Sequence, residues 1–183
     1  IKKQIKKIDN IVEQMLFYAR SDSVEKDYFV KKVLLEDVVH TAIMNYMDSL
    51  IQKKISLDVY NLENYVYIDE KWITFIICQV LQNSIKYLNK PEKVIKIHSE
   101  NNKNNVVLVI EDNGEGILDH DLPRVFEYGF TGTDRQKQYS TGIGLYLCKK
   151  LCNKMNLDIK IESQYKKFTK VKIIFPKTNL YRQ

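Results

Sequence analysis

A carboxylate followed by two glycines lies at the end of a predicted strand. Asp112 closes the apolar stretch Val106–Glu111 and precedes Asn113, Gly114 and Gly116. Asp-Asn-Gly is a common turn sequence, so the spacing by itself fits an ordinary turn. The functional alternative is a carboxylate at the rim of a pocket, accepting a hydrogen bond from an exocyclic amine. The glycines would then let a flat base lie against the backbone.

All six glycines of the 183-residue chain lie between Gly114 and Gly144, and the last two open a predicted helix. Glycines at a helix start leave backbone N–H groups uncrowded, and the helix dipole favours an anion there. The stretch Ser140–Leu145 (STGIGL) therefore predicts a phosphate-binding site. It is neither a dinucleotide fingerprint nor a P-loop, because the third glycine of the former and the GK[ST] of the latter are missing.

A third polar feature, Asn83, lies on a long apolar helix predicted for residues 70–88. Gln79 comes one turn before it, and Lys86 and Tyr87 come one turn after it. A buried amide must find hydrogen-bond partners, so Asn83 either bridges within the core or offers its oxygen to Mg²⁺ beside a nucleotide. A base reader, a metal ligand and a phosphate site complement one another, and this favours the second interpretation.

These residues need strands and helices to bring them together. Periodicity predicts strands at 28–34, 55–60, 65–68, 94–99, 106–111, 157–163 and 168–175, and helices at 36–53, 70–88 and 142–155. Strands that are mostly sequence neighbours, with helices that must cover one face, predict an α+β fold, a two-layer α/β sandwich. Before it, a heptad seam predicts a coiled-coil-like helix that ends at residues 21–23. Its apolar positions are Ile1, Ile5, Ile8, Val12, Met15 and Ala19.

Composition excludes several classes of protein. The chain is 44% hydrophobic and 28% charged, and no apolar run approaches the roughly 20 residues of a transmembrane helix. The net charge of +6 comes from lysines scattered among acids, so no nucleic-acid partner is predicted. Cys78, Cys148 and Cys152 form no CxxC pair, which favours a reducing, cytoplasmic environment over a disulfide or zinc framework.

Four motifs, in this order, resemble those of the catalytic ATP-binding domain of bacterial sensor histidine kinases. This domain belongs to a wider ATPase group that includes gyrase B, Hsp90 and MutL. QVLQNSIKYL (79–88) is similar to the N box, EDNGEGI (111–117) to the G1 box, RVFEYGFTG (124–132) to the F box and STGIGLYL (140–147) to the G2 box. The resemblance covers residues 24–176 and implies the Bergerat-type (GHKL) sandwich.

The segment before these motifs, IDNIVEQMLFYARSDS, resembles the second helix of the dimerisation and phosphoacceptor hairpin. We therefore divide the chain into residues 1–23, part of that hairpin, and 24–183, the catalytic domain. The wording of the last two motifs is most similar to the bacitracin-sensing kinases that act beside ABC transporters.

The resemblance implies ATP and Mg²⁺ as cofactors and a role for each matching residue. Asp112 would hold the adenine amine, Asn83 would coordinate the metal, and Asn83, Gln79 and Lys86 would form the catalytic group. The implied nucleotide-binding residues are Asn83, Lys86, Tyr87, Asp112, Gly114, Gly116, Ile117, Phe130, Thr131, Gly132, Ser140, Thr141, Gly142, Ile143, Gly144, Leu145 and Thr169. Phe126 and Phe130 would brace the lid and touch the hairpin helix. Whether Arg124, Arg135 and Lys137 contact phosphate stays open.

The sequence departs from the family pattern at three positions. Gln79 replaces a commonly acidic residue and cannot act as a general base, although it can position a group by hydrogen bonding. Ser140 replaces the first glycine of the G2 box, which reduces the flexibility of the lid. Phe168 replaces a frequent glycine and weakens the assignment of Thr169.

The phosphoacceptor is the missing part. His40, His98 and His120 lack the His-Glu-x-Lys/Arg-x-Pro type of context, and the chain begins with Ile1 rather than Met. We therefore expect a cytoplasmic fragment of a membrane-anchored kinase that binds Mg-ATP without phosphorylating itself. The implied partners are a second copy through residues 1–20, the receiver domain of a response regulator and an ABC transporter. The alternatives are an ATP-binding domain without kinase activity, a related ATPase or an anti-sigma-type kinase.

Overall fold

A five-stranded sheet is the centre of the computed structural model, which describes residues 11, 12, 14–17, 19, 28–133 and 141–177. Its order is β2-β4-β5-β7-β6, and every pair is antiparallel except β2 and β4. The strands are β2 (Ile55–Tyr60), β4 (Lys93–Asn101), β5 (Asn105–Asp112), β6 (Asp158–Gln164) and β7 (Phe168–Pro176). The antiparallel hairpins β4–β5 and β6–β7 are formed by four of the strands predicted from the sequence.

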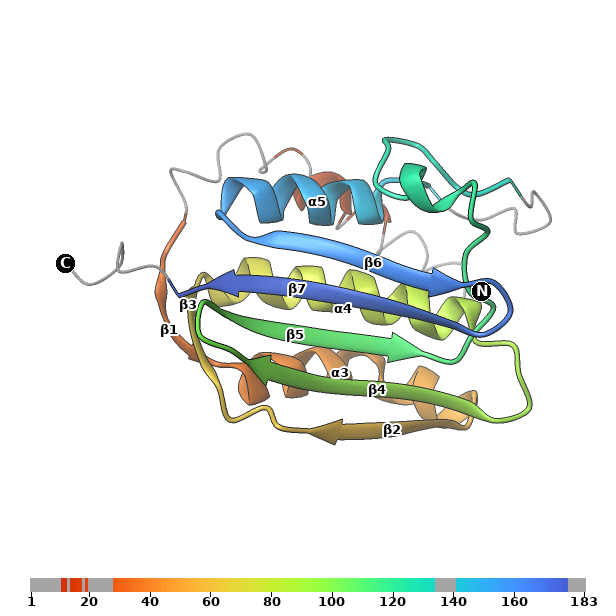
Figure 1. Cartoon of the computed structure of the whole chain (residues 1–183), viewed down its shortest axis with the longest axis horizontal. Helices are drawn as coiled ribbons and strands as arrows, with labels where there is room; N and C mark the ends of the chain where they lie inside the picture. Colours follow the sequence, from red (N-terminus) through yellow and green to blue (C-terminus); the bar gives the residue numbers. More distant parts are fainter. Residues whose placement is uncertain (1–10, 13, 18, 20–27, 134–140, 178–183) are drawn as a thin grey trace.

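Three helices cover one face of this sheet, as Figure 1 shows. They are α3 (Leu35–Gln52), α4 (Glu70–Tyr87) and α5 (Gly144–Lys154). The structure also contains a two-stranded ribbon of β1 (Lys31–Leu34) and β3 (Tyr65–Ile68), and a 3-10 turn η1 (Leu122–Arg124). The predicted α+β two-layer sandwich is thereby confirmed.

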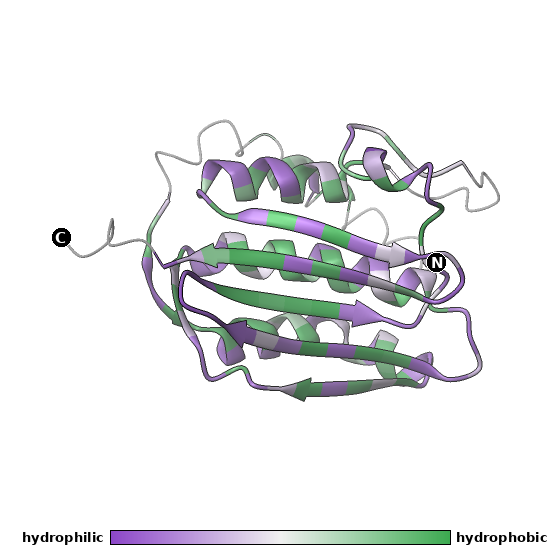
Figure 2. Cartoon of the chain, viewed as in Figure 1, coloured by the Kyte–Doolittle hydropathy of each residue, from purple (hydrophilic) through white to green (hydrophobic). Residues whose placement is uncertain are grey.

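The central strand β5 explains why the layers hold together. Its sequence, NVVLVIED, is buried along most of its length, and Figure 2 shows it hydrophobic where its neighbours alternate with polar residues. Val106, Leu108 and Ile110 face the helices and join the core, and Asp112 continues that face at the end of the strand. Alternation along a strand therefore directs one carboxylate toward the helix layer.

Helix α4 is the main helix under the sheet, and its start is capped. Asp69 accepts the backbone N–H of Lys71 and Trp72 at 2.9 and 3.4 Å. Helix α5 places Cys148 and Cys152 in the same core, where burial raises the pKa of both thiols, that of Cys152 to about 12. These thiols pack as small apolar groups.

Most predicted boundaries agree with the structure within a few residues, with two informative differences. The strand predicted from Tyr28 begins at Lys31, and the helix predicted from about Gly142 begins at Gly144. Gly142 has a φ of +67°, which no residue of a right-handed helix adopts. The parallel β2–β4 pair also brings together strands that are separated in sequence by β3 and α4.

The N-terminal helix is described at residues 11, 12, 14–17 and 19. Gln14 is buried and Phe17 packs against the core, whereas Ile11, Val12, Met15 and Leu16 are exposed. The seam positions Val12 and Met15 thus face away from the catalytic domain, while Ile1, Ile5 and Ile8 lie outside the described residues. Among the described residues, no helix is long and apolar enough to cross a membrane.

Candidate functional site

Asp112 is a nearly fully buried carboxylate, with 4% of its surface exposed. Its Oδ2 accepts the hydroxyl of Ser84 on α4 at 2.8 Å, and its Oδ1 accepts the backbone N–H of Gly114 at 3.0 Å. Burial raises the pKa of Asp112 to about 6, although these two hydrogen bonds oppose the shift. An acceptor fixed between a strand end and a helix suits recognition of an amine.

Thr169 lies beside this carboxylate. It is the register partner of Asp112 across β5 and β7, so the two side chains leave the same face of the sheet. The next strand adds Ser163, whose hydroxyl accepts the backbone N–H of Ile117 at 2.8 Å and lies 3.4 Å from the Thr169 hydroxyl. The two predicted residues Asp112 and Thr169 are therefore neighbours, and Ser163 ties Ile117 to them.

The N-box residues lie on α4, the helix that Ser84 links to the end of β5. Asn83 is half-buried and directly precedes Ser84, and its amide makes no hydrogen bond to any other described residue. The Lys86 ammonium lies 3.3 Å from the Tyr87 hydroxyl, so both residues sit together at the end of the helix. An amide oxygen that has no partner within the described part of the chain fits the kind of ligand that Mg²⁺ prefers.

The second glycine motif packs against the F-box loop. The backbone N–H of Gly129 donates to the carbonyl of Gly142 at 3.1 Å. A Cβ on Gly142 would lie 2.3 Å from the Gly129 carbonyl carbon, so this position requires glycine for close approach as well as for its positive φ. Ile143 precedes α5 without a side-chain cap, which leaves the N-terminus of that helix open to an anion.

The F-box loop carries Phe130, Thr131 and Gly132. The Arg124 guanidinium lies over the Phe130 ring at 4.5 Å. Phe126 packs against the core instead, with the Lys149 ammonium 5.8 Å from its ring. Asp121, a residue that the sequence did not single out, accepts both the N–H and the hydroxyl of Thr133 at 3.1 Å.

Gln79 has a partner that the sequence did not predict. Its Oε1 accepts the Nε2 group of Gln14 at 2.7 Å, and the Oε1 of Gln14 accepts the hydroxyl of Thr141 at 3.2 Å. Gln14 is not one of the apolar heptad positions that the sequence predicted. Heptad spacing cannot show which side of the helix a neighbouring domain covers.

Several predicted residues complete the set. Gly144 and Leu145 begin α5, and Gly116 adopts a φ of +70° in the turn after β5. Ser140, Arg135 and Lys137 lie outside the described residues, so nothing is placed for them. The predicted set otherwise comes from α4, the end of β5, the F-box loop, the start of α5 and β7.

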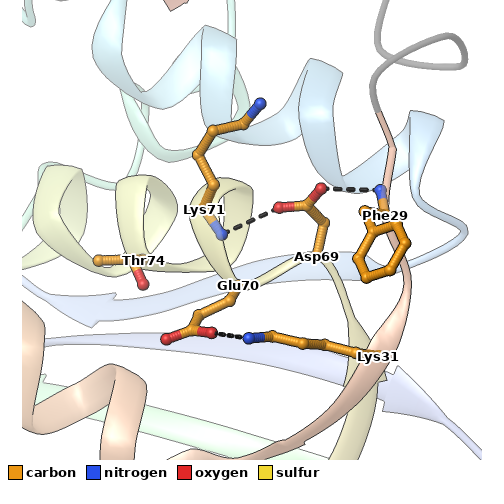
Figure 3. A pocket seen from close by; sticks show the side chains of 6 residues that line it. All are labelled: Phe29, Lys31, Asp69, Glu70, Lys71 and Thr74. Atoms are coloured by element: carbon orange, nitrogen blue, oxygen red, sulfur yellow. Dashed lines mark hydrogen bonds and ion pairs between the residues drawn. The ribbon is translucent and has the colours of Figure 1, made fainter.

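A separate pocket of about 480 Å³ lies at the start of α4, as Figure 3 shows. Its carboxylates are already engaged: Asp69 also accepts the backbone N–H of Phe29 at 2.9 Å, and Glu70 forms an ion pair with Lys31. These contacts fix the chain that enters β1.

A model of the histidine kinase-, DNA gyrase B- and HSP90-like ATPases matches residues 68–179. The chain belongs to this family. The matched range contains Asn83, Asp112, Thr169 and both glycine motifs.

Among characterised proteins, sensor protein BceS of Halalkalibacterium halodurans is 36% identical over 174 residues, which are 94% of this chain and 52% of that protein. Sensor protein kinase GraS of Staphylococcus aureus is 35% identical over 175 residues, which are 94% of this chain and 50% of that protein. The recognition of a sensor histidine kinase is thereby confirmed. The chain spans about half the length of these curated relatives.

The crystal structure of histidine kinase ThkA in complex with response regulator protein TrrA has the same fold. The TM-score is 0.76 at 19% identity, and the alignment covers 99% of this chain and 50% of that one. At this identity the likeness shows the fold alone. It includes the N-terminal helix as well as the sandwich, because nearly the whole chain is covered.

Proposed function

We propose that the chain binds Mg-ATP between α4 and the strand ends of β5 and β7. It would transfer the γ-phosphoryl group to a histidine on a dimerisation helix outside this chain, for relay to a response regulator. The observation that carries the proposal is Asp112, a buried acceptor at the strand end with Thr169 beside it and Asn83 above it on α4.

Each group contributes one part of phosphoryl transfer, which depends on placement and charge neutralisation more than on covalent chemistry. Asp112 accepts the adenine amine, and the uncapped start of α5 donates backbone N–H groups to the phosphates. Asn83 and Lys86 face the phosphates from the end of α4. Mg²⁺ held by Asn83 would neutralise charge on the transferred group. Gln79 donates or accepts a hydrogen bond and takes no proton.

The three histidines of the chain do not replace the missing acceptor. His40 is exposed on α3, His98 stacks on Tyr60 at 4.8 Å, and His120 lies 3.1 Å from the Thr133 hydroxyl. His98 lies on a strand of the sheet and His120 in a loop, away from any helix pair. The chain is therefore expected to bind nucleotide without phosphorylating itself, and acid-labile label from γ-labelled ATP on this chain would contradict that.

The partners follow from the same proposal. The exposed apolar side chains of residues 11, 12, 15 and 16 fit a helix of a second copy in a homodimer of the full-length, membrane-anchored kinase. A response regulator is a proposed partner because ThkA is in complex with one. An ATP-binding domain without kinase activity is the second candidate, supported by Gln79 at a commonly acidic position.

Nucleotide titration of Asp112→Asn tests the proposal. An amide at this position offers a donor where the adenine amine needs an acceptor, so we expect Mg-ATP affinity to fall at least tenfold by calorimetry, a loss of about 1.4 kcal/mol or more. Asp58→Asn, an exposed position on β2, is the matched control and should bind as the wild type does. Equal affinity of the Asp112 variant and the wild type would remove the base-reading role.

A further inference from the structure

The side chain of Gln14 lies between two parts of the candidate nucleotide site that are far apart in sequence. Its Nε2 group donates to Gln79 on α4 at 2.7 Å, and its Oε1 accepts from Thr141, just before α5, at 3.2 Å. Gln14 is 9% exposed and Gln79 is 6% exposed, so both amides are shielded from water. Buried hydrogen bonds of this kind are costly to leave unmade.

A second contact of the N-terminal helix, made by Phe17, fixes its position along α4. Three residues after Gln14, Phe17 stacks on Phe75 with ring centroids 3.9 Å apart and meets Trp72 edge-on at 5.2 Å. Residue numbers rise from 14 to 17 while their partners on α4 fall from 79 to 72. The N-terminal helix therefore runs antiparallel to α4, and Gln14 reaches Gln79 only when Phe17 occupies its aromatic site.

Gly144 makes room for this pair. A Cβ at Gly144 would lie 2.9 Å from Gln79 Oε1 and 3.5 Å from Gln14 Nε2, so the first residue of α5 lies directly against the two amides. The hydrogen bonds also have a direction, from Thr141 to Gln14 to Gln79. Oε1 of Gln79 thus accepts from Gln14, while its Nε2 group has no hydrogen bond to another described residue.

We propose that Gln14 is a positioning residue of the nucleotide site: it orients Gln79 and holds Thr141, so that docking of the N-terminal helix and nucleotide affinity are coupled. The inference rests on the proposed function. Coupling is reciprocal, so nucleotide binding also favours the docked helix. A movement of the helix that withdraws Gln14 releases Thr141 and leaves the Gln79 amide unpaired.

The test combines Mg-ADP titration with the fluorescence of Trp72, the only tryptophan of the chain, which contacts Phe17. Gln14→Leu keeps the size of the side chain and removes both hydrogen bonds. We expect its Mg-ADP affinity to fall roughly fivefold or more, the usual range of coupling between sites. Gln52→Leu, an exposed glutamine at the end of α3, is the matched control and should leave affinity and fluorescence unchanged.

A double-mutant cycle with Thr141→Val assigns the effect to the hydrogen bond. If Gln14 acts through Thr141, the double variant binds no worse than the weaker single variant, because the second change removes a contact already lost. Trp72 emission shows whether Gln14→Leu also releases the N-terminal helix from α4. Lower Mg-ADP affinity supports the coupling in either case, whether the helix stays docked or is released.

Two results would overturn the inference. If Gln14→Leu binds Mg-ADP within twofold of the wild type, the helix does not influence the site. If the losses in Gln14→Leu and Thr141→Val add fully, the coupling does not pass through this hydrogen bond. Failure of the wild-type chain to bind Mg-ADP is a different result, because it would overturn the proposed function as well.

Discussion

Asp112 combines two conditions that oppose each other. Burial raises its pKa to about 6, while the Ser84 hydroxyl and the Gly114 N–H stabilise the ionised form. The carboxylate is thus ionised at neutral pH but holds its charge at a cost to folding. A ligand amine that donates to it would lower that cost, which links recognition of the base to the protonation of one residue.

Adenosine affinity should therefore depend on pH. Only the ionised carboxylate accepts the adenine amine, so affinity is expected to be constant above about pH 7 and to fall up to tenfold per unit below about pH 6. Adenosine is the suitable probe because it carries no phosphate that titrates in this range. Affinity that is constant from pH 7.5 to 5 would contradict a role for the ionised carboxylate.

The same pKa predicts the stability of Asp112→Asn. In the folded state the pKa lies above the ordinary 3.8, so the folded protein binds more protons than the unfolded chain between about pH 4 and 6. The contribution of Asp112 to the free energy of unfolding is therefore fully present below about pH 4, and it is lost as the pH rises through about 6. At pH 7, Asp112→Asn is expected to raise the free energy of unfolding by on the order of 1–3 kcal/mol. Urea denaturation at pH 7 measures it, and a destabilised variant would show that the two hydrogen bonds outweigh burial.

The elements were largely predictable where local pattern decides them. The bounds of β2 and β3 agree with the prediction, because alternating side chains lie between clear turn residues. The start of α5 was predicted two residues early, since a glycine before a helix reads equally well as its first residue. The positive φ of Gly142 and its close approach to Gly129 depend on tertiary structure, which a local sequence pattern does not contain.

Gly129 and Gly142 allow the cost of a positive φ to be distinguished from the cost of a steric clash. Gly129 and Gly142 both have positive φ, +74° and +67°, but a Cβ meets nothing within 4 Å at Gly129 and overlaps the Gly129 carbonyl at Gly142. We expect Gly129→Ala to cost about 1–2 kcal/mol and Gly142→Ala clearly more, because the loop must also move. Thermal unfolding of the two variants measures the difference, and equal costs would show that the loop yields freely.

At the scale of the whole molecule, the motifs predicted the domain but not how the helix before it docks. The order of four boxes predicted the sandwich, and the structure makes Asp112 and Thr169 register partners on β5 and β7. The contact of Gln14 could not be predicted, because a polar heptad position gives no sign of burial. Which face of a helix is covered depends on the partner surface, here Trp72 and Phe75.

Removal of residues 1–27 tests whether the N-terminal helix covers this aromatic surface of α4. The core lies within residues 33–175, so the remainder should fold. Loss of Phe17 uncovers the aromatic site on α4, and we expect Trp72 emission to shift to longer wavelength and stability to fall by about 2 kcal/mol. Tryptophan fluorescence during denaturation records both effects. An unchanged emission maximum would mean that the helix does not cover Trp72 in solution.

The two buried cysteines of helix α5 can report how often this helix separates from the sheet. Its thiols, Cys148 and Cys152, are fully enclosed and their pKa values are raised, whereas Cys78 is only partly covered. A maleimide added to the native protein should therefore modify Cys78 first and reach the other two only when α5 separates from the sheet. The rate of the slow phase of alkylation then measures how often α5 separates from the sheet. Nucleotide bound at the start of α5 should make this phase slower.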